Sequence, residues 1–147
     1  MLTLDQYLLV PQIVFADEKA FLEWTDGLGL SAQIALSFTL NVIGDTNDIR
    51  SLPRKLIKEL HSGICQVRIG KTLKEALNTV RAEKPKSLAG LSDLVLLRVF
   101  FAEIGDASLL VLSAYDKRSD RSNTRQSTEI GKALDILRVW LLQNDVL

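Results

Sequence analysis

The sequence has 147 residues, of which 47% are hydrophobic and 24% charged, and its formal net charge at pH 7 is zero. This length and balance fit one globular domain that buries roughly two thirds of its unfolded surface, and they exclude a disordered or disulfide-rich protein. One cysteine and one histidine exclude an internal disulfide and a zinc site of the common type, so we expect neither a metal nor another cofactor.

The amino-terminal stretch MLTLDQYLLVPQIVF does not fit a signal peptide. It has no basic start, it contains Asp5 and Pro11, and its apolar run is too short. Farther along, charged residues such as Arg98 and Glu103 interrupt the most apolar region before it reaches the roughly 18 to 20 residues of a membrane span. We therefore expect a cytoplasmic protein.

The first structural elements are predicted to be a strand and two helices. Residues 11–15, PQIVF, have the composition of a short strand. Asp17 can cap the first helix, and Ser31 can cap the second, which is expected to run to Gly44. Two helices in succession predict a helical hairpin near the amino terminus.

The middle of the chain is predicted to add a strand and a further helix. RKLIKELHSG, residues 54–63, is expected to form one or two helical turns, and GICQVRI after it a strand. Alternation puts Cys65 on the core face of this strand, as a small buried hydrophobic residue, and puts Gln66 and Arg68 on the other face. KTLKEALNTVRAEKP then has the period of an amphipathic helix, which we expect near residues 71–82.

Two apolar runs, DLVLLRVFFAE and SLLVLSAY, are separated by IGDA and predict neighbouring antiparallel strands. Arg98 stands inside the first run. An unpaired guanidinium there costs several kcal/mol, so it must reach a carboxylate, solvent or a ligand phosphate. A last amphipathic helix is expected around Ala133. The predicted fold class is α+β, with helices packed on a small antiparallel sheet.

Strand alternation allows Arg68, Arg98 and Tyr115 to meet on one face of the sheet, with Tyr115 sharing its face with Val111 and Ser113. Cations from the following turn can join them. Such a set suits an RNA phosphodiester, because Arg binds phosphate oxygens bidentately and Tyr can stack on a base. The alternative is a solvated connection between strand and helix, since exposed ion pairs contribute little.

Charge is unevenly distributed along the chain. Residues 1–50 contain seven acidic and two basic side chains, whereas residues 51–147 contain eleven acidic and sixteen basic ones. This asymmetry is typical of a basic face for phosphate, but a mixed, solvated surface fits it equally well. Both interpretations stay open at this point.

Four stretches, taken in order, resemble the RelE/HigB superfamily of bacterial and phage toxins, especially its HigB-like, phage-derived branch. They are QIVFADEKAFLEWTDGL, LPRKLIKELHSGICQVRI, LLRVFFAEIGDASLLVLSAYDKRSD and RQSTEIGKALDILR. The resemblance implies one RelE-like domain over residues 1–147, with the helix near 71–82 inserted. It also implies the toxin of a type II toxin-antitoxin system, an endoribonuclease that cleaves mRNA on the ribosome or without it, and a cognate antitoxin as partner.

The resemblance further assigns roles to individual residues. The implied reaction is attack of an RNA 2′-hydroxyl on the adjacent phosphate without metal, while cations stabilise the charge that develops on the phosphoryl oxygens. The implied catalytic residues are Arg68, Arg98, Tyr115, Asp116 and Lys117, and the implied substrate-binding residues are His61, Gln66 and Arg118.

The general base is left open between Tyr115, Asp116 and His61, and neighbouring Arg side chains are expected to lower the pKa of Tyr115. Two other functions also stay open. One is a non-enzymatic toxin that shares the fold and inhibits a protein target such as gyrase, as ParE proteins do. The other is an inactive module that binds an antitoxin or a second copy of the chain.

Overall fold

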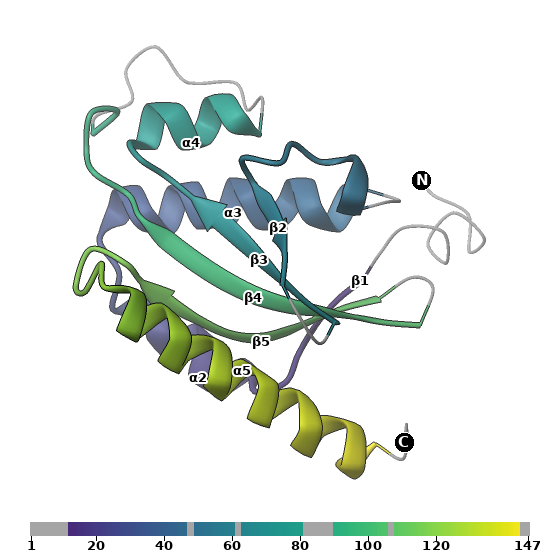
Figure 1. The fold of residues 1–147 in the computed structure, drawn as a ribbon. Helices are drawn as coiled ribbons and strands as arrows, with labels where there is room; N and C mark the ends of the chain where they lie inside the picture. The colour runs from purple at the N-terminus through teal and green to yellow at the C-terminus, as the bar shows by residue number, and fades with distance from the viewer. Residues whose placement is uncertain (1–11, 47–48, 61–62, 81–89, 106–107, 145–147) are drawn as a thin grey trace.

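The computed structural model describes residues 12–46, 49–60, 63–80, 90–105 and 108–144. Within these ranges, five strands and four α-helices form an α+β fold (Figure 1). The helices are α2 (Glu18–Asp26), α3 (Leu30–Asp45), α4 (Leu73–Thr79) and α5 (Asn123–Gln143), with a 3-10 turn η1 (Ile49–Ser51). The strands are β1 (Gln12–Phe15), β2 (Ile57–Glu59), β3 (Ile64–Ile69), β4 (Leu97–Ile104) and β5 (Ser108–Asp116).

The strands form one sheet in the order β1-β5-β4-β3-β2. Strands β2 to β5 pair antiparallel, as predicted for the β4–β5 hairpin, but β1 runs parallel to β5, with Gln12 opposite Ser108. The prediction of a wholly antiparallel sheet is therefore wrong. No tight turn joins β1 to its partner, because α2 and α3 follow it directly, so no hairpin fixes its direction.

Helices cover both faces of the sheet (Figure 1). On one side, called the core face, α3 and α4 pack on alternate strand residues, including Cys65, Val67 and Val99. On the other side, called the α5 face, Phe100 packs with Ala133 of α5 in a second hydrophobic cluster. The predicted alternation of β3 is thus confirmed, and Cys65 is buried on the core face.

The expectation of one or two helical turns at residues 54–63 is confirmed for one turn only, and the described residues that follow this turn form a strand. A single turn forms, in which the N–H groups of Leu56 and Ile57 donate to the carbonyl of Pro53 at 2.9 and 3.1 Å. The chain then extends into β2, where Ile57 pairs with Val67 of β3. One isolated helical turn is costly to nucleate, whereas pairing with β3 satisfies the backbone and buries Ile57.

Helix α4 lies within the predicted range 71–82. Thr72 caps it by accepting a hydrogen bond from the N–H of Glu75 at 3.2 Å, and its buried side chains face α3. Those side chains are Leu73, Ala76 and Leu77. The last two residues of the predicted range, 81 and 82, lie outside the described residues. Helix α4 therefore belongs to the hydrophobic core on the side away from α5.

Helix caps agree with the sequence at one helix and differ at the next. Asp17 caps α2, since its Oδ1 accepts from the N–H of Ala20 at 3.0 Å. At α3 the N-cap is Gly29, and the Ser31 hydroxyl instead donates to Asp93 at 2.7 Å. The expectation that Ser31 caps α3 is wrong, because its side chain bonds to a distant part of the chain. No helix in the described part is long and apolar enough to cross a membrane.

Candidate functional site

Three polar residues form a row across β3, β4 and β5 on the α5 face. Arg68 lies opposite Arg98, and Arg98 lies opposite Tyr115. Directly opposed residues place their Cβ atoms about 4.5 to 5.5 Å apart, so the bases of the three side chains are close neighbours. The sequence predicted that these residues meet on one face, and the strand register confirms it.

A β-bulge in β5 brings Tyr115 to this face. Phe101 pairs with Val111 and Phe100 with Ser113, which leaves Leu112 as an extra residue. Val111 belongs to the core face, whereas Tyr115 packs with the α5 cluster. The expectation that Tyr115 shares a face with Val111 is therefore wrong, because the bulge reverses the alternation between them. Bulges are common beside functional sites, where they redirect a side chain.

A second row lies beside the first on the same face. Lys58 is opposite Gln66, Gln66 is opposite Phe100, and Phe100 is opposite Ser113. Gln66 is only 1% exposed, and Phe100 is fully buried. The two rows together give a floor that combines cations, neutral hydrogen-bonding groups and two aromatic rings.

Four buried polar atoms of this floor have no hydrogen-bond partner among the described residues. They are Gln66 Nε2, Arg68 Nε, Ser113 Oγ and the Tyr115 hydroxyl. An unsatisfied buried group costs about 1 to 3 kcal/mol, and native proteins contain few of them. Four such atoms in two adjacent rows are typical of a site whose binding partners are not among the described residues.

Five cations gather around the same rows, and we call them the cationic cluster. They are Lys58, Arg68, Arg98, Lys117 and Arg121. Among the described residues, no carboxylate forms an ion pair with any of them. Arg68 Nη2 donates to the carbonyl of Arg54 at 2.7 Å, and Arg98 Nη1 donates to that of Leu97 at 2.9 Å. These acceptors are neutral, so the positive charge stays uncompensated.

The cations lower one another's affinity for protons. Burial lowers the pKa of Lys117, and the positive charges of Arg98, Arg121, Arg68 and Lys58 lower it further. Burial also lowers the pKa of Arg98, with a smaller contribution from Arg68. The backbone N–H of Lys117 donates to the carbonyl of Leu96 at 2.7 Å, which ties this turn to β4. A bound anion would relieve the repulsion among these groups.

The ring of Tyr115 is enclosed, with only 2% of the residue exposed. It stacks with Phe100 at 6.2 Å between ring centroids and an interplanar angle of 11°, and Arg125 Cζ lies 5.1 Å from its centroid. The interpretation of Tyr115 as a stacking platform for a base is therefore wrong. Burial raises the pKa of its phenol and outweighs the opposing charge of Arg98, so the expected lowering is wrong too.

Arg125 is held in place by Glu129, one turn farther along α5. Arg125 Nε donates to Glu129 Oε1 at 2.9 Å, and Lys132 Nζ lies 3.4 Å from the same oxygen. Glu129 is only 4% exposed, which is unusual for a carboxylate. Sequence reasoning missed this pair. The available signal was an Arg and a Glu four residues apart, one turn before the buried Ala133.

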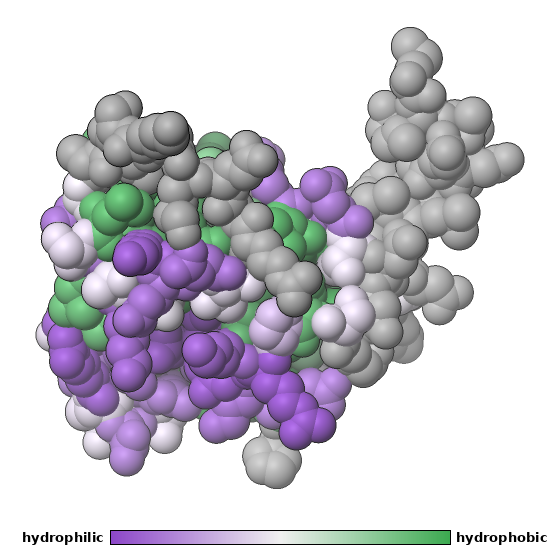
Figure 2. Space-filling view, turned by 90° about the horizontal axis from the view of Figure 1, so that it is seen from above, coloured by the Kyte–Doolittle hydropathy of each residue, from purple (hydrophilic) through white to green (hydrophobic). Residues whose placement is uncertain are grey.

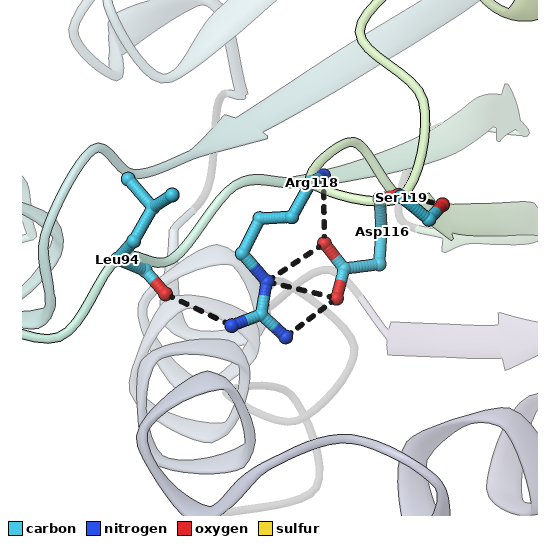
Figure 3. Close-up of polar contacts among 4 residues, drawn as sticks. All are labelled: Leu94, Asp116, Arg118 and Ser119. Atoms are coloured by element: carbon cyan, nitrogen blue, oxygen red, sulfur yellow. Dashed lines mark hydrogen bonds and ion pairs between the residues drawn. The ribbon is translucent and has the colours of Figure 1, made fainter.

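Asp116 and Arg118 bind each other beside Leu94 and Ser119 (Figure 3). Asp116 pairs with Leu97 in the register that faces the core side, and its carboxylate accepts two of its hydrogen bonds from the N–H and Nη2 of Arg118, each at 2.9 Å. Arg118 Nη1 also donates to the carbonyl of Leu94 at 3.3 Å. The structure thus joins these two residues to each other. His61 lies outside the described residues.

A separate pocket of about 370 Å³ lies beside Arg118 and does not include the cationic cluster. Its lining includes the exposed side chains of Leu30 and Leu94, and none of the buried unpartnered atoms. Figure 2 views the molecule from above. Hydrophilic side chains cover the lower half of the face shown there, and separate hydrophobic patches lie in the upper half. We regard the two rows as the candidate site, because they combine uncompensated charge with unsatisfied donors.

Comparison with known proteins adds no relative. The sequence matches no protein-family model, and a search of curated proteins finds no match. Within the described ranges, no group of three or more His, Cys, Asp or Glu side chains is arranged to hold a metal ion. The chemistry of the site therefore has to be argued from its own side chains.

Proposed function

We propose that the chain is an RNA-cleaving toxin of the RelE/HigB type, neutralised by a cognate antitoxin. The observation that supports this most is the row of Arg68, Arg98 and Tyr115 beside Lys117, with charge that no described carboxylate compensates. A phosphodiester supplies the negative charge and the acceptor oxygens that this surface lacks. A RelE-like layout, with α4 inserted between the two Arg-bearing strands, is part of the proposal.

In the proposed reaction, Arg68 and Arg98 bind the nonbridging oxygens of the scissile phosphate. Negative charge builds up on these oxygens when the ribose 2′-oxygen attacks phosphorus, and fixed cations stabilise it most in the transition state. The Tyr115 phenol, whose ordinary pKa is 10.0, is neutral at physiological pH, and burial raises this pKa further. It therefore donates a hydrogen bond to the phosphate.

Lys117 is the proposed general base. Its pKa is lowered by burial and by four neighbouring cations, so its neutral amine is more populated than that of a free lysine. The amine accepts the proton of the 2′-hydroxyl while the 2′-oxygen bonds to phosphorus. The bond from phosphorus to the 5′-oxygen then breaks, which leaves a 2′,3′-cyclic phosphate, and the 5′-oxygen takes up a proton from solvent.

The decisive experiment compares the wild type with the Arg98→Ala, Lys117→Ala double variant after induction in bacteria, with new mRNA 5′ ends mapped. We expect cuts with the wild type alone. A double variant that changes Lys74 and Arg138 to Ala removes the same charges elsewhere, and it should cut like the wild type. Growth arrest without cuts would point to a protein target, and the absence of any phenotype would leave an inactive binding module.

The chemistry can be tested with purified protein and an RNA that it cleaves. A single 2′-deoxy substitution at the scissile nucleotide removes the proposed nucleophile, so cleavage at that bond should stop while binding persists. A deoxy-substituted site that is still cut would rule out attack by the 2′-hydroxyl.

A further inference from the structure

Helix α5 brings an ion pair to the candidate site in an unusual environment. Glu129 is 4% exposed, yet a carboxylate is seldom buried unless its charge is compensated. Arg125 and Lys132 compensate it, and of these two cations Arg125 also lies over the Tyr115 ring. The pair therefore joins α5 to the aromatic residue at the end of the polar row.

The same helix offers an internal comparison. Arg138 and Asp135 form another ion pair on α5, at 3.7 Å, with side chains 72% and 77% exposed. Exposed pairs of this kind contribute little to stability, and within the described ranges Arg138 does not lie over an aromatic ring as Arg125 does. The Arg125–Glu129 pair differs in its burial and in its contact with Tyr115, so helix solubility alone does not account for it.

No hydrogen-bond partner in the described part of the chain fixes the position of the Tyr115 hydroxyl. Its ring is held by Phe100 on the sheet and by Arg125 on the helix. A guanidinium that is fixed by a carboxylate keeps its plane in one orientation, which a free arginine does not do. The location of the hydroxyl thus depends on a contact whose geometry Glu129 determines.

We propose that Glu129 is a positioning residue: by holding Arg125 against the Tyr115 ring, it presents the Tyr115 hydroxyl to a phosphate oxygen bound by the cationic cluster. The identity of this oxygen rests on the proposed function. The positioning itself concerns binding, and it does not require that the bound strand be cleaved. Glu129 touches neither the substrate nor the reacting atoms in this scheme.

A double-mutant cycle tests the proposal with a single-stranded DNA oligonucleotide, which lacks the 2′-hydroxyl. Affinity is measured for the wild type, Glu129→Gln, Tyr115→Phe and the double variant. We expect Tyr115→Phe to weaken binding about 10-fold, the value of a hydrogen bond to a charged acceptor, and Glu129→Gln about 3-fold or more. In the Tyr115→Phe background, Glu129→Gln should change affinity by less than about 2-fold, because the two residues act as one unit.

Equal effects of Glu129→Gln in both backgrounds would overturn the proposal, since a structural role weakens binding whether or not the hydroxyl is present. Asp135→Asn, in the exposed pair of the same helix, should leave affinity unchanged. If Glu129→Gln does not fold, Arg125→Lys replaces it in the cycle, because lysine keeps the charge but lacks the planar group. If the affinities show the expected coupling between Glu129 and Tyr115 but the wild type does not cleave RNA, the proposed nuclease activity would be rejected and the positioning role of Glu129 would stand.

Discussion

The two faces of the sheet are built on the same strands but have opposite compositions. On the core face, alternate residues of β3, β4 and β5 are hydrophobic and pack against α3 and α4. The α5 face starts in the same way around Phe100 and Ala133, but it continues into a floor with four polar atoms and five cations that the described residues leave without a hydrogen-bond partner or a paired carboxylate, respectively. One face therefore stabilises the fold, while the other keeps groups that disfavour it until an anion binds.

The largest expected effect comes from breaking the core face. Leu77 of α4 is fully buried, so Leu77→Ala should lower the free energy of unfolding by about 3 kcal/mol, as measured in urea. Oligonucleotide affinity per folded molecule should not change. Leu142→Ala, at a position 60% exposed in α5, is the control and should shift stability by less than about 0.5 kcal/mol. A loss of binding in Leu77→Ala would show that the two faces are not separable.

The next largest expected effect is an increase in the free energy of unfolding. Gln66→Leu keeps a similar volume but removes a buried amide whose Nε2 has no partner, so the free energy of unfolding should rise by about 1 kcal/mol. The same change removes a donor from the floor and should weaken oligonucleotide binding several-fold. Chemical denaturation and fluorescence anisotropy measure the two quantities. A variant that is destabilised would mean that Gln66 contributes to the fold like a core residue.

The salt dependence of oligonucleotide affinity tests the cationic cluster on the α5 face. Each phosphate contact on a single strand contributes about −0.7 to the slope of log affinity against log salt concentration, so four or five contacts predict a slope near −3. Lys58→Gln and Arg121→Gln should each make the slope shallower by about 0.7. Lys74→Gln, in α4 on the other side of the sheet, should leave it unchanged. Equal changes for all three would indicate diffuse attraction instead of a defined cluster.

The smallest effect concerns pH. Because the pKa of Lys117 is lower in the folded protein than its ordinary value of 10.5, the unfolded chain binds more protons between those two pKa values. Stability should therefore rise with pH in this alkaline range in the wild type relative to Lys117→Met. Urea midpoints from about pH 8 to pH 10 measure this difference, and a wild type that loses stability relative to the variant would contradict the repulsion within the cluster.

Local patterns in the sequence predicted the parts of the fold that depend on neighbouring residues. The alternation that buries Cys65 and exposes Arg68 to the α5 face, and the cap at Asp17, follow from spacing alone. The strand β2 was missed because Ile57 is held by a partner, Val67, that local helix propensity does not include. Long-range pairing outweighs local preference in such short segments.

The candidate site was predictable only in part for a similar reason. Strand alternation correctly predicted that Arg98 and Tyr115 lie on the same face. It wrongly placed Val111 on that face too, because the sequence of this apolar run gives no clear sign of a bulge. The enclosure of Tyr115 depends on Arg125, which reaches it from another element. Asp116 and Arg118 flank Lys117 in the sequence, yet they bind each other, and Asp116 lies opposite Leu97 of the core face.

The bulge at Leu112 also bears on how this strand can tolerate changes in length. Leu112 is one residue more than the register with β4 requires, so β5 contains one residue that has no partner in β4. An in-frame loss of a single codon on either side of it can be absorbed by closing the bulge, and Tyr115 would still lie opposite Arg98. The pairing of Tyr115 with Arg98 is thus expected to survive deletion of one residue. In a strand without a bulge, the same deletion would move the following side chains to the opposite face of the sheet.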